Sequence, residues 1–202
     1  MSEKTNSGKS RYRCHGCAVD SDKRKTLITI AGLALVAGTD IRAVLANDDG
    51  PQRGDRLVPA EGDNATPLRS SDLQTGEKQM ICYPCDPVTG NVRNASPLNQ
   101  ILVIKLDTAE MDPSTAARAA DGILAYSAVC THQGCPVSAW FPDENALTCF
   151  CHFSKFDAVN GADVIDGPAP RPLPALPLKL DSDGQLVIDG DFTEPPGGNT
   201  AA

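Results

Sequence analysis

Short apolar runs separated by turn residues dominate the chain from residue 100 onward. Residues 101–106 (ILVIKL) form a continuous apolar run typical of a buried strand, and residues 123–127 and 147–150 predict two more strands. Residues 176–180 and 185–188 flank Asp181-Ser182-Asp183-Gly184, which predicts a β-hairpin. Residues 112–120 are a helix candidate in which Ser114 is the expected N-cap. Short strands with long loops predict an all-β antiparallel architecture.

The segments on either side of this region lack a regular pattern. Residues 47–67 are polar and rich in Gly, Pro and Asp, and residues 68–99 show little periodicity. We therefore expect a linker and N-terminal extension over residues 47–98, a main domain over residues 99–190 and a disordered tail over residues 191–202.

The N-terminal 46 residues have the organisation of an export signal. A head with a net charge of +4 over residues 1–25 precedes the apolar run at 27–38, which is shorter than a membrane span. Lys23-Arg24 ahead of that run resembles a twin-arginine signal. We expect export to the periplasm, with cleavage after Ala46 or retention of residues 26–46 as a membrane tether. A buried core helix is the other interpretation of the apolar run.

Composition narrows the function further. The 202 residues carry a net charge of −8, and the chain beyond residue 25 carries −12, which argues against a nucleic-acid partner. Aromatic residues make up only 4% of the chain, so the core must be aliphatic or covalently stapled. The chain has eight cysteines but only three histidines. The low number of histidines excludes nearly every site that needs several imidazoles.

Half of the cysteines and two of the histidines lie in two boxes within 23 residues of each other. The first box is C-x-H-x-G-C over residues 130–135, and the second is C-x-C-H-x-S over residues 149–154. One cysteine and one histidine from each box form a Cys₂His₂ set, which suits either tetrahedral zinc or a [2Fe–2S] cluster with two Cys on one iron and two His on the other. A purely disulfide-bonded framework would leave both histidines without a role.

The two boxes resemble those of Rieske iron–sulfur proteins, and residues 167–170 (GPAP) resemble the proline-rich third loop of that family. The resemblance covers about residues 99–190. It implies a Rieske-type antiparallel β sandwich with a small rubredoxin-like subdomain made of loops, which binds one [2Fe–2S] cluster per chain. This makes zinc the weaker of the two readings of the ligand set.

The resemblance also assigns roles to individual residues. It implies that Cys130 and Cys149 bind the inner iron and that His132 and His152 bind the outer iron. It further implies a Cys135–Cys151 disulfide between the two boxes, which an oxidising compartment would preserve. Five residues are expected around the cluster: Gly134 in a tight turn, Ser154 as a donor to a cluster sulfur, Phe156 where high-potential relatives carry Tyr, and Gly167 and Pro168 in the covering loop.

Within the family, Phe153, Phe156 and the residues leading into the first box are most similar to the small subunit of arsenite oxidase. The expected function is therefore electron transfer, non-catalytic by itself, as the small subunit of a periplasmic oxidoreductase. The expected partners are a larger catalytic redox subunit, such as a molybdenum enzyme, and a cytochrome c or cytochrome b. The alternative is the Rieske subunit of a quinol-oxidising cytochrome bc complex. A Rieske oxygenase fails by counting, because its mononuclear iron needs two further histidines and only His15 remains.

Three other features have less definite expectations. Cys82-Tyr83-Pro84-Cys85 predicts a tight disulfide, with half of a metal site as the alternative, and it lacks the histidine of a c-type haem motif. Cys14 and Cys17 precede the apolar run and are expected to lie in a disordered signal region, with a metal-binding or quality-control role as the alternative. Residues 140–142 (WFP) are expected to pack in the core, with contact to a partner as the alternative.

Overall fold

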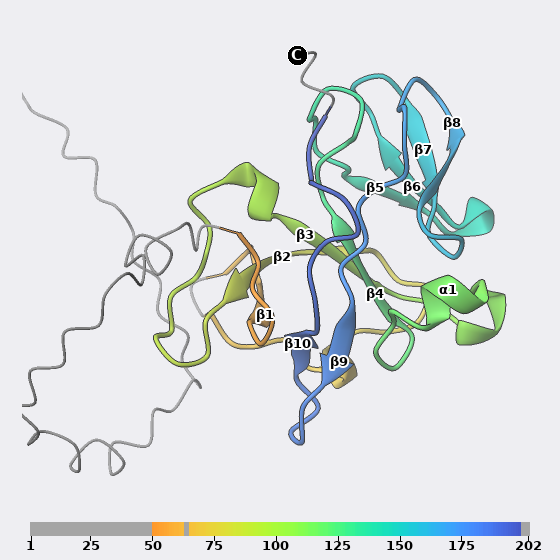
Figure 1. The fold of residues 1–202 in the computed structure, drawn as a ribbon. Coiled ribbons are helices and arrows are strands. Elements are labelled where there is room, and N and C mark those ends of the chain that lie inside the picture. The colour runs from red at the N-terminus through yellow and green to blue at the C-terminus, as the bar shows by residue number, and fades with distance from the viewer. Residues whose placement is uncertain (1–49, 63–64, 199–202) are drawn as a thin grey trace, which may run out of the picture.

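Two antiparallel sheets make up the part of the chain that the computed structural model describes, residues 50–62 and 65–198 (Figure 1). The larger sheet has six strands in the order β4-β3-β2-β1-β10-β9, and the smaller has four in the order β5-β6-β7-β8. The strands are β1 (Arg56–Pro59), β2 (Met80–Cys85), β3 (Ile101–Lys105), β4 (Ile123–Ser127), β5 (Ala139–Phe141), β6 (Ala146–Cys149), β7 (Ser154–Asp157), β8 (Asp163–Asp166), β9 (Leu178–Leu180) and β10 (Leu186–Ile188). The all-β antiparallel class is confirmed.

The six-stranded sheet curls toward a closed barrel. The segment just before β9 lies along the outer edge of β4, where Ser127 N donates to Pro174 O at 2.8 Å and Leu176 N donates to Ala125 O at 2.9 Å. Closure removes the exposed edge that β4 would otherwise present. The smaller sheet corrects one expectation, because the subdomain predicted as loops is built on four strands, and only the segments at its end are loops.

The strands with continuous apolar runs are those that the sequence predicted. β3 and β4 are almost entirely buried and pair along their full length, from Ile101 opposite Ser127 to Lys105 opposite Ile123. β6 starts one residue earlier and ends one residue earlier than expected. The predicted hairpin is formed by β9 and β10, with Leu186 opposite Leu180.

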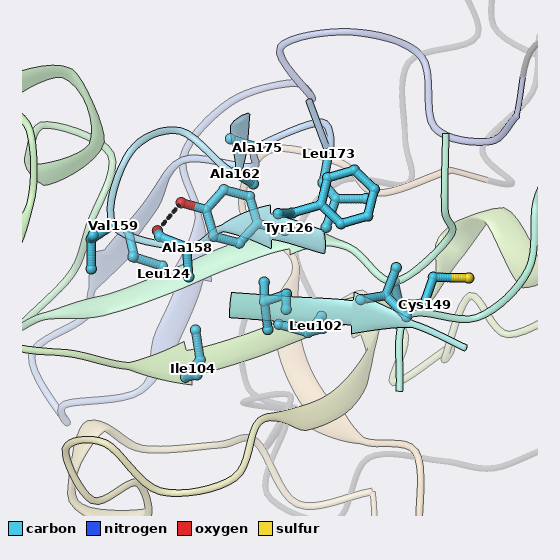
Figure 2. Packing of buried hydrophobic residues seen from close by; sticks show 14 of the residues in the cluster. Leu102, Ile104, Leu124, Tyr126, Cys149, Ala158, Val159, Ala162, Leu173 and Ala175 are labelled. Atoms are coloured by element: carbon cyan, nitrogen blue, oxygen red, sulfur yellow. Dashed lines mark hydrogen bonds between the residues drawn. The ribbon is translucent and has the colours of Figure 1, made fainter. Parts of the chain in front are cut away.

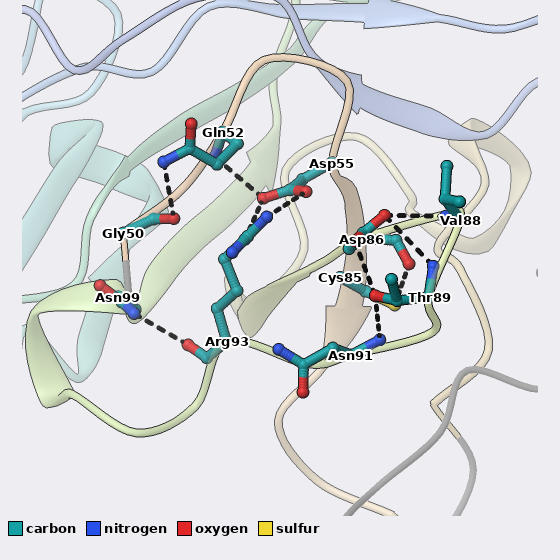
Figure 3. Close-up of polar contacts among 10 residues, drawn as sticks. All are labelled: Gly50, Gln52, Asp55, Cys85, Asp86, Val88, Thr89, Asn91, Arg93 and Asn99. Atoms are coloured by element: carbon teal, nitrogen blue, oxygen red, sulfur yellow. Dashed lines mark hydrogen bonds and ion pairs between the residues drawn. The ribbon is translucent and has the colours of Figure 1, made fainter. Parts of the chain in front are cut away.

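The segment expected to be a linker instead supplies two strands of the barrel. β1 and β2 pair with each other, and β2 also pairs with β3. Figure 3 shows the polar anchor beside them, a buried ion pair in which Arg93 Nε lies 2.8 Å from Asp55 Oδ2. Asn99 Nδ2 donates to Arg93 O at 3.0 Å, which ties this anchor to the start of β3. The folded unit therefore begins well before residue 99.

The predicted Cys82–Cys85 disulfide is not formed, because Cys82 is a free, buried thiol. Both residues lie in β2, and side chains three positions apart in a strand point to opposite faces. Cys82 accordingly packs with the barrel interior and Cys85 with Val58 and Ala65 on the other side. Burial raises the pKa of the Cys82 thiol to about 12.

The helix predicted at residues 112–120 is shorter than expected. It spans α1 (Pro113–Ala116), and its N-cap is Asp112 rather than Ser114. Asp112 Oδ1 accepts hydrogen bonds from Ser114 N at 2.7 Å and Thr115 N at 3.2 Å. Pro113 favours this start, because a proline is well suited to the first helical position and needs no N–H partner there.

One hydrophobic core joins the barrel to the smaller sheet. It contains Leu102 and Tyr126 from the barrel together with Cys149 and Phe156 from the smaller sheet, all 1% exposed or less. Figure 2 shows Tyr126 within this core, where its hydroxyl donates to Ala158 O at 2.7 Å. Since the two sheets share a core, the barrel supports the end of β6 from which the second box starts.

The tail predicted to be disordered is ordered as far as the structure describes it, up to Gly198. Phe192 packs against the barrel core, and Thr193 N donates to Ala175 O at 2.9 Å. Residues 199–202 lie outside the described residues, as do the expected signal over residues 1–46, Cys14 and Cys17. Among residues 50–62 and 65–198, no helix has the length and apolar character needed to cross a membrane.

Candidate metal centre

The first box forms a closed turn between β4 and β5. Cys130 N donates to Cys135 O at 2.8 Å, and Gly134 N donates to Cys130 O at 3.0 Å. Gly134 has φ +78°, a left-handed conformation that glycine adopts without a Cβ penalty. The tight turn expected at Gly134 is thus present, and it brings the two ends of the box together. We call residues 130–135 the first loop.

The second box is the connection of a β-hairpin. Cys149 at the end of β6 lies opposite Ser154 at the start of β7, so residues 150–153 form the loop between them. We call these four residues the second loop. Phe153 within it has φ +59°, which is uncommon for a residue other than glycine and marks a tight reversal of the chain. The hairpin places Cys149 inside and the following side chains at the outer end.

The disulfide predicted between the two boxes is present. Cys135 and Cys151 are bonded, with their Cα atoms 6.4 Å apart, and their bond links the first loop to the second. Cys149 Sγ lies within 4.8 Å of both disulfide sulfurs. Because those two sulfurs are bonded to each other, Cys149 is the only thiol of this group of three that remains available to bind a metal.

The four candidate ligand side chains of the boxes lie in two layers, with the thiols buried and the imidazoles nearer the surface. Cys130 and Cys149 carry free thiols and are each 1% exposed, whereas His152 is exposed and His132 half-buried. The two imidazole rings meet edge to face with their centroids 4.6 Å apart. His132 Nδ1 is buried and has no hydrogen-bond partner among the described residues. A buried imidazole nitrogen without a partner is costly, and a metal ion would satisfy it.

The environment of Cys130 also suits a cation. Burial raises the pKa of the Cys130 thiol, the backbone N–H of His132 lowers it, and the adjacent Cys149 sulfur raises it again. The Ser154 hydroxyl acts to lower the pKa. Two thiols this close cannot both ionise in a buried site without a compensating positive charge. The donor set therefore fits a metal centre held by two thiolates and two imidazoles.

The third loop covers this centre through Ser154. Gly167 has φ +86°, and a Cβ on it would lie 2.6 Å from Ser154 Cα and 2.8 Å from Phe153 O, so only glycine fits. Ala169 N donates to Ser154 Oγ at 3.1 Å. The hydroxyl therefore accepts a bond from the third loop and keeps its own proton for a sulfur acceptor. Pro168, which lies between Gly167 and Ala169 in this loop, is exposed.

Phe156 is fully buried and lies opposite Leu147 in the β6–β7 pairing, where its ring belongs to the shared core. The structure also brings in residues that the sequence analysis missed. Thr131 Oγ1 donates to Arg171 O at 2.7 Å and so joins the first loop to the chain just after the third. Nothing in the local sequence distinguishes Arg171. Thr131, in contrast, lies between Cys130 and His132, and this position could have identified it as part of the site.

An exposed aromatic patch lies beside the histidines and was only partly anticipated. It consists of Phe141, Phe150 and Phe153, which are 38%, 53% and 66% exposed. Phe150 forms edge-to-face contacts with each of the other two, at 6.4 Å between centroids. Trp140 packs against the core as expected, and its Nε1 donates to Gly76 O at 3.2 Å. Phe141, expected with it in the core, faces outward.

Replacing Ser154 by alanine is expected to lower the midpoint potential of the bound centre by about 60 mV. A hydrogen bond to a charged acceptor contributes about 1.5–3 kcal/mol, and a preference of about 1.4 kcal/mol for the reduced state corresponds to 59 mV in a one-electron couple. An EPR-monitored redox titration measures the shift. Thr148→Val is the matched control, because Thr148 is a buried hydroxyl next to Cys149 whose Oγ1 has no partner among the described residues. An equal shift in both variants would contradict the role given to Ser154.

Comparison with known proteins identifies the domain. Residues 73–177 match the Rieske [2Fe-2S] domain family. A protein of Haloferax mediterranei named as a respiratory nitrate reductase Rieske subunit is 36% identical over 88% of this chain and 80% of its own length. The cytochrome bc1 complex Rieske iron-sulfur subunit of Streptomyces coelicolor is 32% identical over 85% of this chain, which spans 49% of that relative.

A second cytochrome bc1 subunit and one solved structure are also similar to this chain. The cytochrome bc1 complex Rieske subunit of Corynebacterium efficiens is 33% identical over 72% of this chain and 36% of its own length. Among solved structures, the soluble domain of Rieske protein II from Sulfolobus acidocaldarius is 25% identical, covers 51% of this chain and 68% of its own, and has a TM-score of 0.41. With two cysteine–histidine boxes folded around one buried donor set and a family match over more than half its length, this chain belongs to the Rieske [2Fe-2S] family.

Proposed function

We propose that this chain carries one electron at a time between a larger respiratory enzyme and a cytochrome, and that it makes or breaks no substrate bonds itself. In the proposal, Cys130 and Cys149 hold the inner iron, and His132 and His152 hold the outer iron. The observation that carries it is the asymmetry of the donor set: both thiols are 1% exposed, whereas His152 is exposed. An electron can then enter and leave only through the histidine edge.

When bound, the [2Fe–2S] cluster supplies one-electron redox chemistry at a potential that its two neutral imidazole ligands raise. The protein's own residues set the conditions for it. The Cys135–Cys151 disulfide links the first loop to the second, which would hold the two ligand pairs at a constant separation. Ser154 is buried and the third loop packs closely against it, so both would shield the bound centre from water. Such a rigid, dry site keeps the structural change during electron transfer small.

The relatives named above are subunits of larger respiratory complexes, which supports a role as one subunit of such a complex. They are named for nitrate reductase and cytochrome bc1, so they lend no support to the arsenite oxidase assignment. The larger subunit would perform the substrate chemistry.

We place the protein in the periplasm, exported by the twin-arginine route. A disulfide between two exposed or half-exposed cysteines persists only in an oxidising compartment, which supports export. The charge of −12 beyond residue 25 would suit a basic docking face on the cytochrome. Residues 26–46 would tether the protein to the membrane if the signal is retained.

The second candidate is the Rieske subunit of a quinol-oxidising bc complex. It is favoured by the Ser154 hydroxyl within the covering loop, the interloop disulfide and the bc1 relatives. It is opposed by Phe156, which is buried where a tyrosine donor would add a further hydrogen bond and raise the potential. The two candidates therefore differ in the expected midpoint potential.

An EPR-monitored redox titration of the full chain tests both candidates. A rhombic spectrum of the reduced protein with a low average g-value would support histidine ligation. A midpoint near the top of the range of about −150 to +300 mV that Rieske centres span would favour quinol oxidation, and a distinctly lower value would favour the carrier. Zinc in place of iron, with no EPR signal, would refute both.

Replacing Phe150 and Phe153 together by serine is expected to slow electron transfer to a protein acceptor by about tenfold. Exposed aromatic side chains beside the exposed His152 would be buried at the contact, and losing two of them costs more than about 1.4 kcal/mol of docking free energy. Stopped-flow oxidation of the reduced protein by a c-type cytochrome measures the rate. Val88→Ser, at an exposed apolar residue in the turn after β2, is the control. A rate that falls equally with a small inorganic oxidant would contradict a docking role.

A further inference from the structure

The C-terminal segment runs from the end of β10 to the first loop. In Figure 1 it is the dark blue trace that rises from β10 and ends beside the loop that follows β4. It is attached along the way, since Phe192 packs on the barrel core and Ala175 N donates to Thr193 Oγ1 at 2.9 Å. We call residues 191–198 the C-terminal strap.

The end of the strap is in close contact with the first loop. A Cβ on Gly198 would lie 2.8 Å from Gly134 N, 2.9 Å from Gln133 Cα and 2.9 Å from His132 O. All three are atoms of the first loop's backbone, which cannot move aside as a flexible side chain would. Gly197 is itself buried, and a Cβ there would lie 3.1 Å from Leu98 Cδ2. The strap therefore lies directly on the backbone that carries His132.

One arginine clasps the strap. Arg171 Nη1 lies 3.2 Å from Glu194 Oε2, and its Nη2 donates to Pro195 O at 2.8 Å and to Gly197 O at 2.9 Å. A planar guanidinium can reach three acceptors in this way, whereas a lysine ammonium lacks the rigid fork. The clasp fixes the strap just before the residue that touches the first loop.

The same arginine is connected to the first and third loops. Its carbonyl oxygen accepts the hydrogen bond of Thr131 Oγ1 at 2.7 Å, and it directly follows the third loop, residues 167–170. Arg171 thus connects the first loop, the third loop and the C-terminal strap, the first two through its backbone and the strap through its side chain.

We propose that Arg171 is a positioning residue for the outer-iron ligand His132, and that it acts by holding the C-terminal strap against the first loop. The inference rests on the proposed function, in which His132 is a ligand. The strap limits the motion of the first loop and covers its backbone from water, and both effects control the electronic environment of a metal centre. Loosening the clasp would leave the four ligands in place but let water approach the histidine side.

Two variants of the full chain separate the clasp from its charge. Arg171→Lys keeps the positive charge but loses the three-acceptor clasp, and Gly198→Ala forces the strap and the first loop apart without any change in charge. Arg53→Gln is the matched control, because Arg53 is also an arginine that donates to a backbone carbonyl, that of Asp189, just before the strap.

Backbone hydrogen exchange over residues 131–135 and the EPR spectrum of the reduced protein are the two measurements. We expect exchange at least tenfold faster in Arg171→Lys and Gly198→Ala, together with shifted g-values and a higher midpoint potential, since water stabilises the more negative reduced state. Arg53→Gln should match the wild type in all three. Unchanged exchange and spectra in both strap variants would overturn the inference. A wild-type chain without a [2Fe–2S] signal would overturn the proposed function itself, a result distinct from the first.

Discussion

Replacing Cys149 by serine is expected to give a folded chain that holds no iron–sulfur cluster. Cys149 is 1% exposed and ends β6 at the centre of the candidate site, within reach of Cys130. Serine is a poor ligand for iron, and in the proposed assignment the loss of the Cys149 sulfur would leave the inner iron with a single protein thiolate. Cys149 is one of many members of the buried core, serine is close to it in size, and the Cys135–Cys151 disulfide is made by other sulfurs, so the β fold should persist.

The measurement combines iron content, the EPR amplitude of the reduced protein and far-UV circular dichroism. The wild type should contain two iron atoms per chain, and Cys149→Ser should contain fewer than a tenth of that, with a spectrum of folded β structure. Cys82→Ala is a matched control, because Cys82 is also a free, buried cysteine in a strand but lies in the barrel interior. It should keep its full iron content. Equal iron loss in both variants would mean that any buried cysteine is needed for folding, and that Cys149 is not a ligand.

The features that the sequence predicted best are those encoded within a few neighbouring residues. The two boxes were recognisable because each fits its donors into six residues, and the fold brings both boxes to one end of the smaller sheet. β3 and β4 were recognisable because they are buried on both faces and therefore continuously apolar. In these cases, the local sequence and the tertiary environment favour the same local structure.

The features that the sequence did not predict depend on distant partners. β1 has only four residues and β2 contains Pro84, so neither has a strong strand pattern, and both exist because the barrel pairs them. The Cys82–Cys85 spacing suggested a tight disulfide, but the strand conformation that pairing with β1 imposes turns the two side chains to opposite faces. The C-terminal strap is rich in Gly and Pro, which indicates disorder, and contacts with distant residues hold it in place: the clasp by Arg171, the packing of Phe192 on the barrel core and the hydrogen bonds of Thr193 with Ala175.

Gly167→Ala is expected to be the most damaging substitution in the third loop. The new Cβ would lie 2.6 Å from Ser154 Cα and 2.8 Å from Phe153 O and Ser154 N, all of which are backbone atoms of the hairpin that carries the second box. The third loop would have to move away, and Ser154 Oγ would lose its hydrogen bond from Ala169 N. Strain at a positive φ together with such a clash is expected to cost about 3 kcal/mol.

Gly184→Ala separates the clash from the backbone strain. Gly184 has φ +74°, close to the φ of Gly167, but a Cβ there would meet nothing within 4 Å. It should therefore lose only about 1 kcal/mol, equivalent to about 2–4 °C in Tm, while Gly167→Ala should lose about three times as much. Only Gly167→Ala should also lower the midpoint potential, because only its clash displaces the loop that orients Ser154. If both variants lose the same stability and keep the same potential, the third loop does not hold the hydroxyl in place, and Ser154 must be oriented by its own strand.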